Sequence, residues 1–297
     1  MTLPPPLALP PQVACPLAGK TSFKMGGAAE WLLQPSNLDE LQACLAWAQA
    51  VGLPWWLLGR GTNLLISDVG LQGVVIKLAG DFTQIRLLPK GQLQAGAAAG
   101  DAALAKAARQ AGWAGLEFLS TIPGSLGGAV KMNAGAHGGE LSQVLREAVV
   151  LTPQGQVETW QAADLGWGYR TSRLRREGGV CLQALLQLQP SEEAAIAAVE
   201  ANLKQKRQET QPQDFPNCGS LFQNPPGLAA GRLLDELGFR GQAWGQVRLS
   251  PRHANFLENL GNAKLVEVEA AVKELQTAAR SQRGVELVLE AEIWKNP

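Results

Sequence analysis

The chain has 297 residues, of which 46% are hydrophobic and 18% charged, a composition typical of water-soluble globular proteins. Its 26 Lys and Arg balance 26 Asp and Glu, so no overall field favours nucleic acid or a membrane surface. No uncharged apolar run reaches the ~20 residues of a membrane-spanning helix, and the proline-rich residues 1–19 lack the charged start of a signal peptide. We therefore expect a cytoplasmic protein with a flexible tail over residues 1–19.

The positions of the cysteines and of possible metal ligands argue against disulfides and against a metal site. The four cysteines are scattered and include no Cys-x-x-Cys pair, which favours free thiols in a reducing compartment over disulfides. No group of His, Cys, Asp and Glu has metal-ligand spacing, so no metal is expected.

Hydrophobic patterning predicts an α+β chain without internal repeats. A strand over 28–34, a helix that begins after the N-cap candidates Ser36 and Asn37, and a strand over 55–58 come first. Strands over 74–78 and 92–97 follow, then a helix over 102–111 capped by Asp101, then strands over 147–151, 157–160 and 180–188.

A new domain is predicted to begin at Ser191. Its first helix has Ile196, Val199 and Leu203 on the buried face. A short helix over 229–237, a longer one over about 263–280 and an alternating strand over 285–294 complete the chain. The predicted division is therefore 20–190, with subdomains of about 20–73 and 74–190, and 191–297.

Two glycine-rich loops each follow an apolar run. The first has the sequence GRGTNL over 59–64 and lacks the third glycine of the dinucleotide-binding fingerprint, because Leu64 stands there. The second contains IPGSLGG over 122–128, a row of backbone N–H groups with few side chains in front, which suits phosphate. A tight structural loop is the alternative for either. Together, two such loops suit one long diphosphate-bearing cofactor held between them.

Several motifs, in order along the chain, resemble those of the UDP-N-acetylenolpyruvoylglucosamine reductases, also called UDP-N-acetylmuramate dehydrogenases. They are TSFKMGG at 21–27, LGRGTNLL at 58–65, IPGSLGG at 122–128 with MNAGA at 132–136, YRTS at 169–172, CGSLFQNP at 218–225 and LVLE at 287–290. The resemblance covers about residues 20–294. Family members with a longer chain carry an inserted, tyrosine-bearing loop over the substrate. This chain has no room for that loop, and its single tyrosine already belongs to the YRTS motif, so it looks like the shorter subtype.

The resemblance implies a two-subdomain FAD-binding fold of the vanillyl-alcohol-oxidase (PCMH) type, followed by a C-terminal α+β substrate-binding domain. It implies FAD and NADPH as cofactors and the reduction of UDP-N-acetylglucosamine enolpyruvate to UDP-N-acetylmuramate. That reaction supplies peptidoglycan synthesis, and through it cell-wall biogenesis, cell shape and cell division. The partner is then a small UDP-sugar enolpyruvyl ether, with no nucleic acid and no membrane, and a monomer is expected. The implied cofactor-binding residues are Gly59, Arg60, Gly61, Thr62, Asn63, Leu64, Gly124, Ser125, Gly127 and Gly128.

The resemblance also implies three catalytic residues, namely Arg170, Ser220 and Glu290. Arg170 would stabilise an anionic intermediate, for which a guanidinium fork suits a carboxylate, and Ser220 would protonate it. Glu290 shares one face of the predicted last strand with Glu286 and Glu292, so periodicity leaves all three open and only the resemblance selects Glu290. Tyr169 and Asn224 are implied as substrate-binding residues.

Some positions depart from the family pattern or stay unassigned. Ala291 and Glu292 stand where the family has Val and a basic residue, and Gln223 stands where many members have Lys. A diphosphate clamp has four candidates among which the sequence does not choose: Lys206, Arg207, Arg248 and Arg252. His253 is expected to be structural, and His137 lies beside the second glycine loop.

Two other classes stay open. A different flavin oxidase or dehydrogenase of the same cofactor fold would lack the Gly-Ser-Leu-Phe loop and would not need NADPH. A cofactor-free binding protein would use both glycine loops for structure alone. The colour of the purified protein and its bleaching by NADPH separate these classes.

Overall fold

The computed structural model describes residues 3–297. The chain separates into two compact units, and each is assembled from three stretches of sequence. The first unit comprises Met1–Gln12, Leu32–Arg60 and Val74–Arg207, and the second comprises Val13–Trp31, Gly61–Gly73 and Gln208–Pro297. The predicted domain limits at 73 and 190 stay a prediction, and residues 1–2 of the predicted tail lie outside the described residues.

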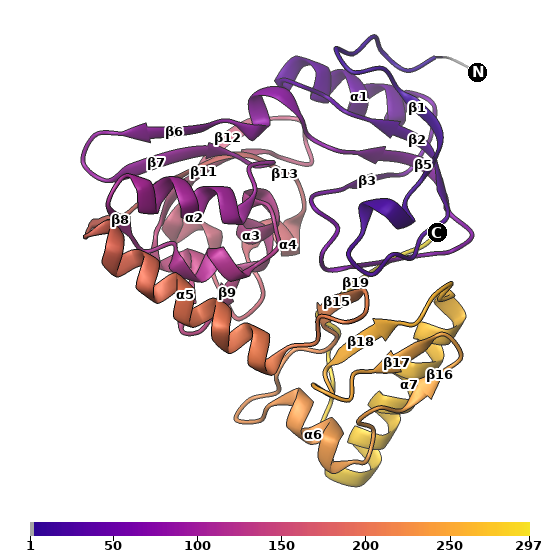
Figure 1. Cartoon of the computed structure of the whole chain (residues 1–297). Helices are drawn as coiled ribbons and strands as arrows, with labels where there is room; N and C mark the ends of the chain where they lie inside the picture. The colour runs from indigo at the N-terminus through magenta and orange to yellow at the C-terminus, as the bar shows by residue number, and fades with distance from the viewer. Residues whose placement is uncertain (1–2) are drawn as a thin grey trace. The chain divides into compact units, whose positions relative to one another are not determined.

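The main sheet of the first unit has five antiparallel strands in the order β12-β11-β13-β7-β6. They are β6 (Ile85–Leu88), β7 (Gln92–Gly96), β11 (Leu145–Leu151), β12 (Val157–Gln161) and β13 (Val180–Gln187). Figure 1 shows α2 (Asp101–Gln110), α3 (Leu126–Met132) and α5 (Glu193–Thr210) on one side of this sheet. β13 alternates buried and half-buried residues along most of its length, because one face lies under helices.

A four-stranded sheet has the order β1-β2-β5-β3. Its strands are β1 (Gln12–Pro16), β2 (Ala28–Leu33), β5 (Leu71–Ile76) and β3 (Trp55–Leu57). The helix α1 (Leu38–Ala50) begins as predicted, since the Asn37 side chain accepts a hydrogen bond from the backbone N–H of Glu40 at 2.9 Å. The strand β1 lies within residues 1–19, which the sequence predicted to be a flexible tail. Burial of Cys15 and Leu17 gives the apolar contact that orders this part of the tail.

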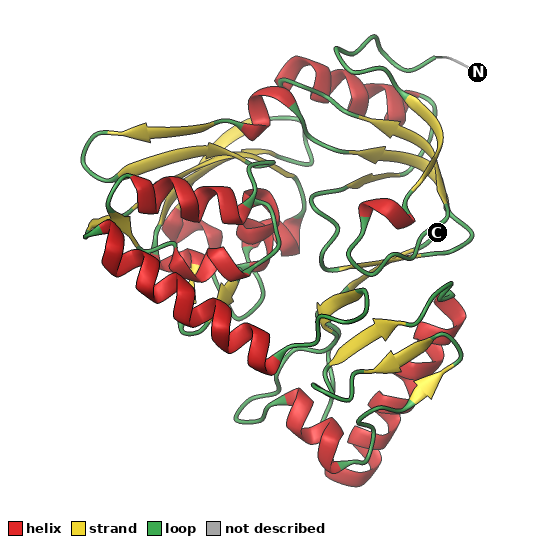
Figure 2. Ribbon diagram, viewed as in Figure 1, coloured by secondary structure: helices red, strands yellow, loops and turns green. Residues whose placement is uncertain are grey.

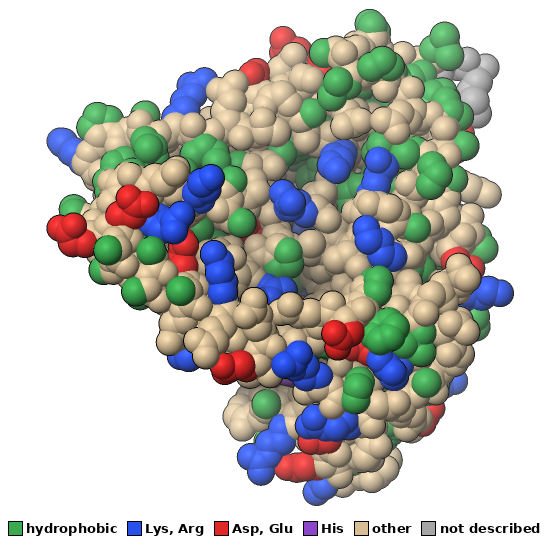
Figure 3. All heavy atoms as spheres, in the orientation of Figure 1, with side chains coloured by type: hydrophobic (Ala, Val, Ile, Leu, Met, Phe, Trp, Pro, Cys, Tyr) green, Lys and Arg blue, Asp and Glu red, His purple; other side chains and the backbone are tan. Residues whose placement is uncertain are grey.

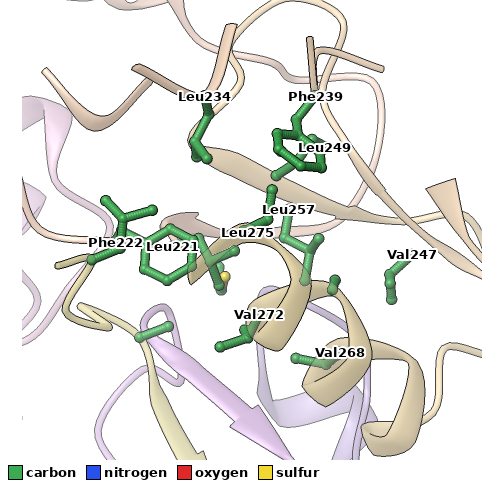
Figure 4. Packing of buried hydrophobic residues seen from close by; sticks show 14 of the residues in the cluster. Leu221, Phe222, Leu234, Phe239, Val247, Leu249, Leu257, Val268, Val272 and Leu275 are labelled. Atoms are coloured by element: carbon green, nitrogen blue, oxygen red, sulfur yellow. The ribbon is translucent and has the colours of Figure 1, made fainter. Parts of the chain in front are cut away.

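The second unit contains a sheet in the order β15-β18-β17-β16. Its strands are β15 (Asn217–Ser220), β18 (Phe256–Asn259), β17 (Val247–Leu249) and β16 (Ala243–Trp244), with the helices α6 (Ala230–Glu236) and α7 (Leu265–Arg283). The predicted apolar face of α7 is confirmed, because Val268, Val272 and Leu275 are buried in a core that includes Leu221 and Phe222 (Figure 4).

Shorter elements complete both units and are drawn in Figure 2. The small ladders pair β8 (Trp113–Ala114) with β14 (Gln189–Pro190), β9 (Gly135–Ala136) with β10 (Gly139–Glu140), and β4 (Leu64–Ile66) with β19 (Glu292–Trp294). The short helices are α4 (Arg173–Glu177), η1 (Ala18–Lys20), η2 (Gly80–Thr83), η3 (Glu117–Thr121), η4 (Leu141–Gln143) and η5 (Ala162–Leu165).

The structure corrects three details of the predicted elements. The last strand covers only Glu292–Trp294, because residues 285–291 lie beside a loop that offers one isolated bridge, Phe222 to Leu289. Val199 is 47% exposed, and the buried face of α5 contains Ile196 and Glu200 instead. Asp101 lies inside α2, whose N-cap is Gly100.

Some sequence expectations concern absences within residues 3–297. All four cysteines are free and buried, as expected. In this part of the chain no group of His, Cys, Asp and Glu is arranged to hold a metal ion. The helices that it contains are all too short or too polar to span a membrane.

Candidate active site

The two glycine loops meet in the first unit. A Cβ atom added to Gly59 would lie 2.8 Å from Oγ of Ser125, and one added to Gly100 would lie 2.8 Å from Nη1 of Arg60. Gly100 and Ser125 also form an isolated antiparallel bridge. The structure therefore brings together Gly59, Arg60, Gly124 and Ser125, four of the residues that the resemblance implies for cofactor binding.

The N–H groups of the second loop are less available than the sequence suggests. The backbone N–H of Leu126 donates to the Ala99 carbonyl at 3.0 Å, and that of Gly127 donates to the Ala97 carbonyl at 2.8 Å. A Cβ on Gly127 would lie 3.0 Å from the Cβ of Ala97. Gly127 is therefore needed for packing of α3 inside the protein. The sequence gives no signal for this, because the partner lies 30 residues away.

Gly128 presents the open side of the same loop. It is exposed, and a Cβ added to it would meet only Oγ of Ser125, at 3.7 Å. The Arg60 side chain is also exposed and forms no ion pair or hydrogen bond among the residues that the structure describes. An unpaired guanidinium beside exposed glycines fits a diphosphate, since anions need local cationic groups and close backbone approach.

Asp101 is a feature of this cluster that sequence reasoning assigned only to helix capping. Its side chain is 1% exposed, and neither carboxyl oxygen has a hydrogen-bond partner within residues 3–297. Burial raises the pKa of the carboxyl to about 8, although the nearby charge of Arg60 opposes the shift. A carboxyl with that pKa is mostly uncharged at neutral pH.

The other half of the first loop belongs to the second unit and is held by the segment around 20–22. Gly61 has φ of +67°, and a Cβ there would lie 2.3 Å from the Lys20 carbonyl oxygen, so only glycine fits. Ser22 donates from its N–H to the Gly61 carbonyl at 3.0 Å, and from its hydroxyl to the Thr62 carbonyl at 3.3 Å and the Asn217 carbonyl at 2.7 Å. These contacts explain part of the 21–27 motif.

Asn63 and Leu64 connect this loop to the end of the chain. The Asn63 side-chain amide donates to the Glu290 carbonyl at 2.9 Å, and the Glu292 N–H donates to the Asn63 carbonyl at 2.9 Å. Leu64 is 8% exposed and begins β4, opposite Glu292. Both residues therefore position the segment that contains Glu290.

Arg170 is held in a fixed turn of the first unit. Its φ is +55°, a left-handed conformation that costs a non-glycine residue about 1–2 kcal/mol. The guanidinium donates to the Gly135 carbonyl at 3.0 Å and lies 5.1 Å from the ring centre of Tyr169. Arg175 donates to the Arg170 carbonyl at 2.5 Å, and Asn133 donates to the Gly168 carbonyl at 3.2 Å. The MNAGA and YRTS motifs therefore form one local structure.

Ser220 and Glu290 lie on neighbouring segments of the second unit. Ser220 ends β15, and its hydroxyl has no hydrogen-bond partner among the described residues. The N–H of Glu290 donates to the carbonyl of Leu221, the next residue, at 2.9 Å. Burial raises the pKa of the Cys218 thiol to about 12, and the charge of Glu290 adds to this shift. Cys218 is therefore a protonated neighbour, not a nucleophile.

The three glutamates that periodicity left open now differ. Glu286 is exposed and pairs with Arg280 at 2.5 Å, and this bond lowers its pKa. Glu290 is half-buried beside the Ser220 strand, and Glu292 takes part in β19. Pairing with Arg280 commits Glu286 to the surface, which leaves Glu290 and Glu292 as candidates.

The two residues implied for substrate binding are at the surface. Tyr169 is 49% exposed, next to Arg170. Asn224 is exposed, and its side-chain oxygen accepts a hydrogen bond from the N–H of Ala230, the first residue of α6, at 3.0 Å. Asn224 therefore also ties the loop after Ser220 to a helix.

Two of the four basic residues that could bind the nucleotide diphosphate, Arg248 and Arg252, already bind other protein groups. Arg248 binds the buried carboxylate of Glu258 at 2.7 Å and stacks on Phe215. Arg252 donates to the Glu209 carbonyl at 3.3 Å. Basic and acidic side chains both occur on the face shown in Figure 3, in keeping with the zero net charge.

His253 has a structural environment. Its Nδ1 accepts a hydrogen bond from the Asn255 N–H at 3.2 Å, and its ring contacts Phe256. Burial lowers its pKa, so the ring stays neutral at pH 7. These contacts agree with the expectation from the sequence.

The chain is similar to known proteins over most of its length. Residues 29–160 match the family described as FAD binding domain, and residues 211–294 match the UDP-N-acetylenolpyruvoylglucosamine reductase C-terminal domain. The UDP-N-acetylenolpyruvoylglucosamine reductase of Acidiphilium cryptum is 44% identical over 93% of this chain and 88% of its own length. That of a Synechococcus species is 44% identical over 86% of this chain and 82% of its own.

A solved structure gives the same result. The UDP-N-acetylenolpyruvylglucosamine reductase of Thermus caldophilus superposes with a TM-score of 0.81 at 35% identity, covering 96% of this chain and 98% of that one. The predicted fold class, a PCMH-type FAD-binding domain followed by a C-terminal substrate domain, is confirmed. The chain belongs to the UDP-N-acetylenolpyruvoylglucosamine reductase family and is an FAD-containing oxidoreductase.

Proposed function

We propose that this protein uses NADPH to reduce UDP-N-acetylglucosamine enolpyruvate to UDP-N-acetylmuramate, a step of peptidoglycan precursor synthesis, as a cytoplasmic monomer. The observation that carries the proposal is the main-chain hydrogen bond from Glu290 to Leu221, at 2.9 Å. This bond holds the backbone of Glu290 against Leu221, the residue after Ser220, in a chain whose relatives carry the name of this reductase.

The residues of the first unit fit FAD. The exposed guanidinium of Arg60 and the open face at Gly128 suit the diphosphate, and Gly59, Gly124 and Ser125 line the same place. When bound, FAD supplies the hydride chemistry, taking a hydride from NADPH and giving it to the enolpyruvyl double bond. The matches to residues 29–160 and 211–294 support separate cofactor-binding and substrate-binding domains at about 20–190 and 191–297.

The protein side chains would stabilise the negative charge that develops on the substrate and supply one proton. Addition of hydride to the terminal vinyl carbon leaves negative charge on the adjacent carbon and its carboxylate. In our proposal Arg170, with its guanidinium fork, and Glu290 stabilise that charge. The Ser220 hydroxyl gives its proton to the adjacent carbon, which a weak acid can do only because a carbanion is strongly basic. Tyr169 and Asn224 contact the substrate.

Anaerobic absorbance of the flavin tests the function. NADPH alone should bleach the protein, and UDP-N-acetylglucosamine enolpyruvate should then restore the oxidised spectrum and gain two hydrogen atoms. Protein that NADPH bleaches but that this substrate fails to reoxidise would contradict the proposed reaction. A different flavin oxidase or dehydrogenase of this cofactor fold would instead resist bleaching by NADPH.

A further inference from the structure

Asp101 lies beside Gly124 and Arg60 of the proposed diphosphate site, and within residues 3–297 neither oxygen of its buried carboxyl has a hydrogen-bond partner. Its N–H donates to the Gly124 carbonyl at 3.1 Å, and a Cβ on Gly124 would lie 2.2 Å from its Oδ2. Burying a carboxyl without a hydrogen bond destabilises a protein, so such a group within residues 3–297 calls for an explanation in function.

The charged groups around Asp101 are few. Arg60 is the charged side chain that acts on the carboxyl, and its guanidinium lies against Gly100, the preceding residue. The helix α2 packs on η3 and β8. In η3, the Glu117 carboxylate is bound to the N–H of Gly115 at 2.9 Å, and β8 contains no charged residue. The charge state of this site therefore depends on Asp101 and Arg60.

We propose that FAD binds with Asp101 uncharged, and that an ionised Asp101 opposes binding because it neutralises Arg60 and repels the diphosphate. This proposal rests on the assignment of the diphosphate to Arg60 and the glycine loops. Asp101 is then a positioning residue that makes the cationic charge of Arg60 available to the cofactor without touching the flavin.

The sign of the effect follows from linkage. The Asp101 pKa of about 8 means that the carboxyl is mostly protonated at pH 7 and ionises above pH 8. A bound diphosphate, being anionic, raises that pKa further, so FAD binding takes up a proton from solution at and above pH 8. Affinity for FAD should therefore fall as pH rises, by up to tenfold per pH unit for one linked proton.

Flavin fluorescence titrations of apo-protein between pH 6.5 and 9.5 test the proposal without measuring activity. For the wild-type protein, the dissociation constant of FAD should be flat below about pH 7.5 and should rise at least fivefold by pH 9. Asp101→Asn, which stays neutral, should bind FAD tightly with little pH dependence. The control Asp81→Asn removes an exposed carboxylate that binds the Gln84 side chain, and it should follow the wild-type curve.

Calorimetry supplies a second measurement that needs no variant. FAD binding to wild-type protein at pH 8.5 in two buffers of different ionisation enthalpy should show uptake of a substantial fraction of one proton. Asp101→Asn should show less uptake than wild type under the same conditions.

Several outcomes would overturn the proposal. Parallel pH curves for wild type and Asp101→Asn would show that Asp101 is not linked to FAD. Affinity that rises with pH in the wild type alone would mean that the carboxylate accepts a hydrogen bond from a cofactor hydroxyl. Arg60→Gln tests the diphosphate assignment separately from the role of Asp101. If that variant binds FAD as wild type does, the diphosphate assignment has failed. If Arg60→Gln binds FAD weakly while Asp101→Asn has the same FAD affinity and pH dependence as wild type, only the proposal for Asp101 has failed.

Discussion

The side-chain amide of Asn63 donates a hydrogen bond of 2.9 Å to the main-chain carbonyl of Glu290, across 227 residues of sequence. The Glu292 N–H returns a bond to the Asn63 carbonyl at 2.9 Å. A residue that the resemblance implies for FAD binding therefore fixes the backbone at a residue proposed for catalysis. We expect substitutions at Asn63 to affect both FAD binding and catalysis.

Asn63→Ala should cost about 1–3 kcal/mol of unfolding free energy, because it leaves the part-buried Glu290 carbonyl without its donor. It should also slow substrate-dependent reoxidation of the flavin more than reduction by NADPH. Chemical denaturation and stopped-flow absorbance measure the two effects. The control is Asn296→Ala, which removes an exposed bond to the Gln72 N–H and a long bond of 3.4 Å to the Gly70 carbonyl, and should change little. Equal effects of the two variants would contradict the role given to Asn63.

Glu290→Gln should reduce turnover far more than either neighbouring substitution. Glu286→Gln breaks only an exposed ion pair with Arg280, which is worth little. Glu292→Gln tests the remaining candidate. Steady-state kinetics of the three variants at one pH decide among them, and matching losses at 290 and 292 would refute the selection of Glu290.

Ser220→Ala should leave FAD content and flavin reduction by NADPH near wild-type values, because the hydroxyl has no structural partner among the described residues. Reoxidation by the enolpyruvyl substrate should slow by roughly 10²–10⁴, the usual contribution of a general acid. Ser220→Cys should keep part of the rate, since a thiol can still donate a proton. Rapid-mixing absorbance resolves both halves. A defect limited to the NADPH half would assign Ser220 to nicotinamide binding.

Gly127→Val and Gly128→Val should fail in different ways. At 127 the new Cβ lies 3.0 Å from that of Ala97, so overpacking should cost about 1–3 kcal/mol of stability. At 128 the side chain has room within the protein, so the apo-protein should be about as stable as wild type. Its affinity for FAD should nevertheless drop at least tenfold if the diphosphate lies there. Thermal unfolding and flavin content measure the pair, and a Gly128→Val protein with full FAD would place the diphosphate elsewhere.

Asp101→Asn should stabilise the apo-protein by an amount that grows with pH. The carboxyl has a folded pKa of about 8 against a reference value of 3.8, so folding takes up a proton between these values. Its contribution to stability is present below about pH 4 and is lost as pH rises toward 8. The Tm of the variant should exceed that of wild type by at least about 2 °C at pH 8, with a smaller difference at pH 5. A difference that stays constant over this range would show that the carboxyl does not titrate as described.

Local patterns predicted the elements that depend on local chemistry. The cap at Asn37 and the apolar face of α7 follow from side-chain spacing, and both are confirmed. The same patterns could not show that the Gly127 N–H is occupied, because its acceptor, Ala97, belongs to a different element. Nor could they show that Asp101 is buried without a partner, since Asp at the first turn of a helix is ordinarily exposed and favourable. The choice of Glu290 needed the resemblance, because the predicted last strand had Glu286 and Glu292 on the same face.

The interleaving of the two units has a consequence for synthesis of the protein. The second unit takes Val13–Trp31 and Gly61–Gly73 from the beginning of the chain and Gln208–Pro297 from its end. Phe23 and Leu65 are made early, yet the core that covers them includes Leu275 and Leu287. During translation these early segments therefore wait, with apolar surface exposed, until the ribosome has nearly finished. Such surface promotes aggregation, so recovery of native enzyme should depend on chaperones and on an intact carboxyl terminus.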